Sequence, residues 1–142
     1  MTVLAFSATA FAEAPTDVRA RVDHHVRHAT ELADHFEVVI KDSCPRFATP
    51  SEWDTYADGE IERMVLLAAH LEQAWVEAKT TGDDDVRRTA KAPRKRLGEA
   101  RPLLDKLQTC AERNGATFSA GDAWQRIERE VPRRQAEIAL PR

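Results

Sequence analysis

Long apolar runs, glycine and an excess of charge of one sign are all scarce in this 142-residue sequence. The apolar run at residues 3–12 falls far short of the roughly 20 residues that cross a bilayer, so no transmembrane helix is expected. A formal net charge of −3 argues against a dedicated nucleic-acid-binding protein, because phosphate contacts require a basic surplus. With 42% hydrophobic and 32% charged residues and only 5 glycines, the composition is that of one globular domain.

The apolar run at the N-terminus ends like a secretory signal peptide. Ala10-Phe11-Ala12 has the A-x-A pattern of a cleavage site, although no basic residues precede the run. The alternative is an apolar arm that packs on the folded domain. We therefore assign residues 1–12 to a signal-peptide remnant or an apolar arm and residues 13–142 to a single helical domain. A periplasmic or secreted location follows from the first reading, and no cysteine follows the site to carry a lipid anchor.

Apolar residues recur in alternating steps of three and four, which is the spacing of amphipathic helices, and no stretch alternates as a strand would. The first helix is expected from just after Thr16 to about Ser43, because Pro45 disfavours helical geometry in the residue before it. A capping box at residues 49–52 opens the second helix, and Gly82 ends it.

Prolines interrupt the second half of the sequence without breaking its periodicity. The third helix is expected to begin within residues 83–85, and its rhythm continues across Pro93 and Pro102, which predicts one kinked helix rather than two. A capping box beginning at Ser119 opens a shorter fourth helix, which Pro132 is expected to kink or end. Four such helices joined by short turns predict an all-α, antiparallel, up-down-up-down four-helix bundle.

The only two cysteines, Cys44 and Cys110, have neither the spacing of a redox motif nor the companions of a zinc finger. They follow the first helix and end the third, and these two helices run in the same direction in an up-down bundle. Both cysteines therefore fall at one end, where a disulfide would stabilise the fold by about 4 kcal/mol in the chain-entropy model. Two unpaired cysteines are the alternative.

Four of the five histidines lie in the first helix, and three of them share a narrow line of its surface with one glutamate. Histidines at positions i and i+4 can bind one divalent transition metal such as zinc, nickel or copper, and a carboxylate one turn away can add an oxygen ligand. The alternative is a solvated, histidine-rich face, because the line lies about 120° from the centre of the apolar face. The candidate metal ligands are His24, His28, Glu31 and His35.

Two polar residues, His25 and Glu60, occupy core positions of the helical pattern, where an unpaired polar group would be costly. Folding the second helix back on the first places His25 level with His70, and Glu60 level with Asp34 and His35. A buried acid–base or metal site is one interpretation, and a satisfied pair of core residues is the other.

His70 also allows a signalling hypothesis, because phosphotransfer domains of bacterial signalling resemble this chain in being four-helix bundles, and they carry one exposed histidine. Those domains have a basic residue three positions after the histidine and usually a glycine next, whereas Gln73 and Ala74 stand here. The match is therefore to the bundle and not to the motif.

Residues 87–101 carry seven basic residues against one acid, whereas residues 17–79 carry thirteen acids against seven bases. Internal pairing between these regions is one explanation, and an anion-binding or phospholipid-binding surface is the other. The stretch has no aromatic residue on which single-stranded nucleic acid could stack. The candidate anion-binding residues are Arg87, Arg88, Lys91, Arg94, Lys95, Arg96 and Arg101.

No sequence pattern of a catalytic site or covalent cofactor is recognisable. The sequence therefore favours an exported, non-enzymatic helical bundle that binds a partner, with a transition metal on the histidines of the first helix as its most specific form. The alternative is a cytoplasmic signalling or scaffold bundle that uses His70 or the basic third helix.

Overall fold

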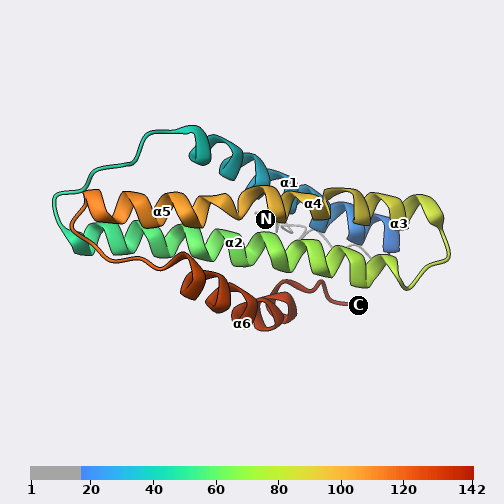
Figure 1. The fold of residues 1–142 in the computed structure, drawn as a ribbon. Coiled ribbons are helices and arrows are strands. Elements are labelled where there is room, and N and C mark those ends of the chain that lie inside the picture. The colour runs from blue at the N-terminus through green and yellow to red at the C-terminus, as the bar shows by residue number, and fades with distance from the viewer. Residues whose placement is uncertain (1–16) are drawn as a thin grey trace, which may run out of the picture.

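A computed structural model describes residues 17–142, so the hypothesis of a signal peptide at residues 1–12 lies outside the described residues. The described chain is all-α and forms four antiparallel rods (Figure 1). The helices are α1 (Val18–Lys41), α2 (Pro50–Ala78), α3 (Asp84–Lys91), the 3₁₀ turn η1 (Ala92–Arg94), α4 (Lys95–Ala100), α5 (Pro102–Arg113) and α6 (Ala120–Ile138). The four-helix bundle predicted from the sequence is confirmed.

Side-chain caps fix the helix beginnings close to the positions predicted. Asp17 accepts hydrogen bonds from the backbone of α1, and the Thr49 hydroxyl accepts one from the Glu52 N–H at 3.2 Å. The Glu52 carboxylate in turn accepts from the Ala48 N–H at 3.0 Å, which completes the capping box one residue earlier than the usual pattern. Ser119 caps α6 in the same way.

The third rod, from α3 to α5, shows how each proline is accommodated. Pro93 lies in the 3₁₀ turn, and Pro102 begins α5 after a break at Arg101. The first position of a helix tolerates proline because its missing N–H would have no partner there. The predicted kinked third helix is therefore found, whereas α6 continues through Pro132 to Ile138 instead of ending there.

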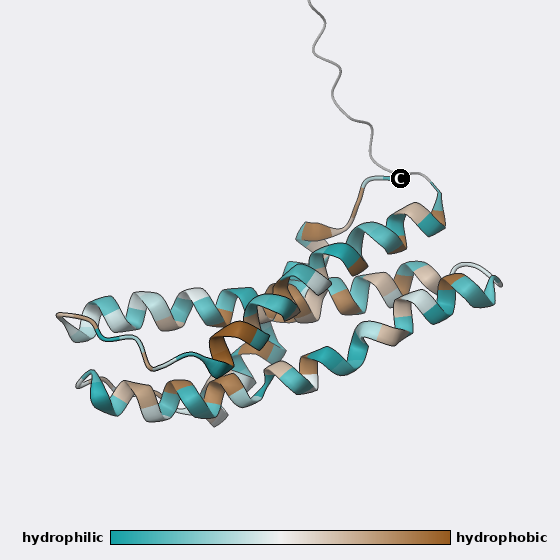
Figure 2. Ribbon diagram, turned by 90° about the horizontal axis from the view of Figure 1, so that it is seen from above, coloured by the Kyte–Doolittle hydropathy of each residue, from teal (hydrophilic) through white to brown (hydrophobic). Residues whose placement is uncertain are grey.

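The interior of the bundle differs along its length. Brown and teal residues alternate along each helix in Figure 2, as expected of amphipathic helices. One part of the core, which we call the disulfide half, is built from large apolar side chains that include Phe36, Trp53, Met64 and Leu107. The other part, which we call the polar half, has a small apolar cluster of Val22, Ala74, Ala78, Val86 and Ala90 beside the buried polar residues Arg21, His25, His70, Gln73 and Glu77.

The predicted disulfide is present between Cys44 and Cys110, with a distance of 5.4 Å between the two Cα atoms. It links the segment after α1 to α5, at the end of the bundle where the 42–49 and 114–119 connections lie (Figure 1). The loop it closes spans a sequence separation of 66 residues. A crosslink of that span restricts the unfolded chain strongly.

Candidate functional site

Four histidine side chains gather where α1 packs against α2 in the polar half. The ring centroids lie 4.6 Å apart for His24 and His28, 5.0 Å for His28 and His70, and 6.3 Å for His24 and His70. His25 lies behind them, with its centroid 5.3 Å from that of His70. We call His24, His25, His28 and His70 the histidine cluster. Two helices thus bring four imidazole rings, each of which can be a metal ligand, to one place.

The innermost contact of the cluster joins Nδ1 of His25 to Nδ1 of His70 at 3.0 Å. A single proton between two such nitrogens makes a hydrogen bond, whereas two protons would repel, so the pair is stable as two neutral rings. His25 is fully buried and His70 is 7% exposed. Burial, followed by the charge of His24, lowers the pKa of His25 to about 4, and burial and the charge of His25 lower the pKa of His70 to about 3.

The four-residue metal site predicted on α1 is not assembled. His24 and His28 adjoin each other, but His35 turns to Glu60, and Glu31 is exposed. The reason is distance along the helix, since the eleven residues from His24 to His35 span roughly 16 Å at 1.5 Å per residue. A line on one helix surface cannot surround a single ion over that length. His70 of the neighbouring helix takes the third place beside His24 and His28.

The second predicted polar contact lies farther along the bundle, in the disulfide half. Nε2 of His35 is 2.9 Å from Oε2 and 3.1 Å from Oε1 of Glu60, and Glu60 is 3% exposed. The Arg63 guanidinium donates to the same carboxylate at 3.1 Å. The predicted register of α1 and α2 is therefore correct at both His25–His70 and His35–Glu60.

A buried network that the sequence reading did not identify extends the polar half. Arg21 donates to both carboxylate oxygens of Glu77, at 3.0 and 2.8 Å, and to the backbone carbonyls of Leu140 and Pro141. The Gln73 amide donates to Glu77 at 3.2 Å and accepts from Gln135 of α6.

The pairing with Arg21 lowers the pKa of Glu77, and the same pairing raises the pKa of Arg21. A signal for this network was present in the sequence. Arg21 precedes His25 by four residues, and Glu77 follows His70 by seven, so each lies on the same helix face as one of the two histidines that the sequence places level with each other.

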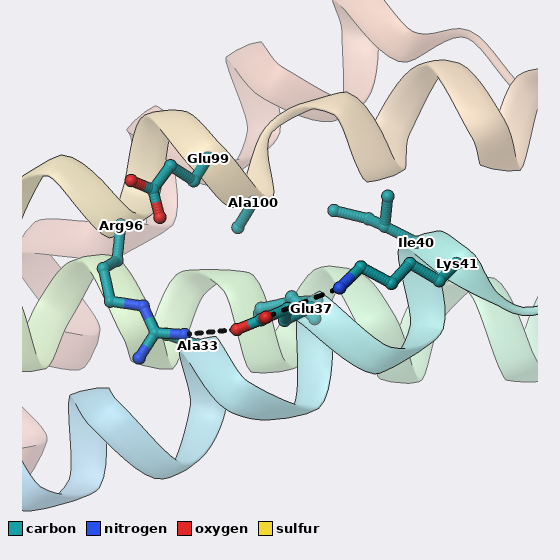
Figure 3. A pocket seen from close by; sticks show the side chains of 8 residues that line it. Ala33, Glu37, Ile40, Lys41, Arg96, Glu99 and Ala100 are labelled. Atoms are coloured by element: carbon teal, nitrogen blue, oxygen red, sulfur yellow. Dashed lines mark hydrogen bonds and ion pairs between the residues drawn. The ribbon is translucent and has the colours of Figure 1, made fainter.

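The basic residues of the third rod are largely paired with acids of α1 and α2. Arg96 donates to Asp34 at 2.8 Å and to Glu37 at 3.2 Å, and Arg94 donates to Glu72 at 2.8 Å. Figure 3 shows Glu37 between Arg96 and Lys41 on the wall of a pocket of about 320 Å³. These contacts support internal pairing and leave little positive charge there for an anion.

The remaining members of the predicted anion-binding set do not converge. Arg88 pairs with Asp85 on its own helix, and Arg101 lies over the Trp124 ring. Arg87 donates to the backbone carbonyls of Lys79 and Thr81, between α2 and α3. Lys91 and Lys95 are exposed. The seven residues therefore form no common site.

Three general findings complete the description. Among residues 17–142, no group of three or more histidine, cysteine, aspartate or glutamate side chains is arranged, as the side chains stand, to hold a metal ion. Over the same part of the chain, no helix combines the length and apolar character needed to cross a membrane. Comparison of the chain with protein-family models, with curated proteins and with solved structures found no match.

Proposed function

We propose that this protein is an exported helical bundle that binds a divalent transition metal through His24, His28 and His70. The observation that carries the proposal is the gathering of three imidazole rings from two helices within one cluster. Imidazole nitrogen is a ligand that suits zinc, copper and nickel. Two of these residues belong to the set predicted from the sequence, and His70 replaces Glu31 and His35.

The spacing of the rings supports a shared ion. A zinc–nitrogen bond of about 2.0–2.1 Å and tetrahedral angles place the centroids of two coordinating imidazoles roughly 5 Å apart. The three centroid distances, 4.6, 5.0 and 6.3 Å, bracket that value. Binding therefore requires the rings to turn so that three nitrogens aim at one point.

His25 is suited to orient the metal-binding ring of His70. Histidines that bind metals commonly use their second ring nitrogen in a hydrogen bond that fixes the tautomer. In this cluster Nδ1 of His70 already faces Nδ1 of His25 at 3.0 Å, so Nε2 of His70 is the nitrogen left for a metal. Nδ1 of His25 then accepts a hydrogen bond from the Nδ1–H of His70, and His25 acts as a positioning residue rather than as a ligand.

Export is supported by the disulfide, because such bonds persist mainly in oxidising compartments. The cytoplasmic phosphotransfer alternative is disfavoured, since its histidine must be exposed and His70 is 7% exposed. Mass spectrometry of the protein recovered from its natural cells distinguishes these locations. We expect an N-terminus at Glu13 and an intact Cys44–Cys110 bond, and a full-length reduced chain would contradict export.

The metal proposal is tested by calorimetric titration of the full chain, with its disulfide intact, with zinc, nickel and copper salts. We expect 1:1 binding of at least one of these ions, and His28→Ala should weaken it by about a hundredfold because a direct ligand is lost. His70→Ala should weaken binding to a similar degree.

Glu31→Gln provides the matched control, because this exposed residue lies on α1 one turn from His28 without belonging to the cluster. Its affinity should equal that of the unchanged protein. Equal affinity in His28→Ala and Glu31→Gln would contradict the proposal, and so would the absence of binding by all three metals.

A further inference from the structure

A second pocket, of about 270 Å³, lies between α1, α2 and α5 beside the disulfide. The polar residues His35, Tyr56 and Glu60 of α1 and α2 line it, together with the apolar residues Leu103 and Leu107 of α5. Glu60 is ten residues from His70 on α2, or roughly 15 Å along the helix, so this pocket is separate from the histidine cluster. None of the residues that line this pocket belongs to the proposed metal site.

Among the residues that line the pocket, carboxylates outnumber ammonium groups. Two carboxylates, Asp42 and Glu60, and one ammonium, that of Lys106, line it. The Lys106 ammonium donates to the backbone carbonyls of Val39, Ile40 and Asp42, so it is occupied by the C-terminal end of α1. That helix end carries partial negative charge, which offsets the ammonium.

The buried carboxylate is the main polar group that a ligand would meet. Glu60 is 3% exposed, and His35 and Arg63 hold it in place by hydrogen bonds. A carboxylate has about four acceptor positions, and the hydrogen bonds from these two residues leave capacity for a further donor.

The hydroxyl of Tyr56, which lines the same pocket, has no hydrogen-bond partner among residues 17–142. Burial and the nearby Glu60 charge raise the pKa of Tyr56, so the hydroxyl keeps its proton and can also accept a hydrogen bond through its oxygen. It gives an incoming donor a second contact beside Glu60.

The size and the apolar lining residues restrict the ligand further. Ligand pockets commonly measure about 300–1,000 Å³, so a volume of about 270 Å³ suits a molecule with few carbon atoms. Val39, Pro45, Leu103 and Leu107 provide contacts for a short hydrocarbon chain. A charged donor at one end and an apolar body at the other describe a small alkylammonium ion.

We propose that this pocket binds a small organic cation, a primary ammonium on a short hydrocarbon chain, whose head group donates to Glu60 and Tyr56 while its chain contacts Leu103 and Leu107. The proposal does not depend on metal binding. It assigns a binding role to the His35–Glu60 pair, in which His35 orients the carboxylate.

The test is a titration of the full, disulfide-bonded chain with n-butylammonium chloride, followed by the NMR signals of the Leu103 and Leu107 methyl groups. At about pH 8 the ammonium stays charged, since alkylammonium groups such as lysine titrate near 10. We expect saturable shifts of both methyl signals. 1-Butanol, which has the same chain and no charge, should bind at least about tenfold more weakly because its hydroxyl carries no positive charge to pair with the Glu60 carboxylate.

Two variants separate the carboxylate from the cavity. Glu60→Gln retains the shape and should weaken n-butylammonium binding at least about tenfold, whereas Glu37→Gln, at the other α1 pocket, should leave it unchanged. Val39→Phe fills the pocket without touching Glu60 and should abolish binding, which keeps the test valid if Glu60→Gln does not fold. Equal affinity for n-butylammonium and 1-butanol, or no methyl shift with either, would overturn the proposal.

Discussion

The two halves of the bundle are held together by different means. The disulfide half has large apolar side chains in its core and a covalent link between α5 and the segment after α1. The polar half has mainly alanine and valine in its apolar cluster, and its larger buried side chains are Arg21, His25, His70 and Glu77. One half therefore depends on apolar burial, and the other depends on hydrogen bonds and charge pairing.

Because of this difference, the stability of the two halves should depend differently on pH. Apolar packing stabilises over a wide range of pH, whereas buried ionisable groups stabilise only in one protonation state. A buried pair also contributes less than its Coulomb attraction suggests, because both charges have lost water. The polar half should accordingly be the part that responds to pH, to substitution and to ligands.

The largest effect is expected from Arg21→Ala. The substitution leaves the Glu77 carboxylate buried without its main partner and removes two hydrogen bonds to backbone carbonyls. Breaking a buried ion pair in this way costs about 3–5 kcal/mol, and the added carbonyl contacts favour the upper end. Urea denaturation measures the loss.

Arg88→Ala serves as the matched control, since Arg88 forms an exposed pair with Asp85 and should change stability by less than about 1 kcal/mol. The double variant Arg21→Met with Glu77→Leu should recover most of the stability lost in Arg21→Ala, because no charge is then left buried. A double variant as unstable as the single one would show that the polar half needs this pair for more than charge compensation.

Removing the crosslink should have the next largest effect. Replacing both Cys44 and Cys110 by alanine frees a loop of 66 residues in the unfolded chain, at a cost of about 4 kcal/mol in the chain-entropy model. Because that cost acts through global unfolding, amide hydrogen exchange should accelerate in the disulfide half. Amides of α3 in the polar half should change less if that half opens locally. Uniform acceleration along all helices would contradict a difference between the halves.

A decrease in pH should also destabilise the polar half, and the part of this effect due to His25 alone is smaller than the loss from removing the crosslink. In the folded protein the pKa of His25 is lowered from an ordinary 6.5 to about 4, so between these values the unfolded chain binds protons that the native state does not. Stability is therefore complete above pH 6.5 and falls as the pH approaches 4. The His25 shift alone corresponds to about 3 kcal/mol.

The measurement for that prediction is the urea midpoint of the metal-free protein as a function of pH. His24, His28, Arg21 and Glu77 all face the His25–His70 pair and influence the pKa values of its two rings, and the lowered pKa of Glu77 extends the loss of stability below the ordinary range of a carboxyl group. The variant His25→Phe should reduce the slope between pH 6.5 and 4 without abolishing it, because the lowered pKa of His70 acts over the same range. An unchanged slope in that variant would assign the effect to other groups.

Much of the fold could be predicted because its determinants are local. Helical periodicity, the caps at Thr49 and Ser119, and the kink of the third rod at its prolines each depend on neighbouring residues alone. Bundle topology placed Cys44 and Cys110 at the same end, where the structure shows them paired. Pro132 was harder to judge, since the sequence could not show whether α6 would continue beyond it, and α6 does continue.

The candidate site was predicted only in part, because it combines residues from two helices. Register placed His25 beside His70 and His35 beside Glu60, yet a one-helix view grouped His35 with His24 and His28. Which neighbour a side chain prefers depends on rotation of the helix about its axis, and periodicity does not fix that rotation finely enough. The same limit concealed the pairing of Arg21 with Glu77.

The segment that carries Cys44 is held in place by more than its sulfur. The Asn114 side chain accepts from the Phe47 N–H at 2.9 Å and donates to the Pro45 carbonyl at 3.0 Å, and Lys106 binds the end of α1. These contacts do not involve the disulfide and would remain after its reduction. The two thiols would then stay at a high effective concentration, so a reduced molecule that keeps its fold would tend to reform this bond whenever an oxidant returns.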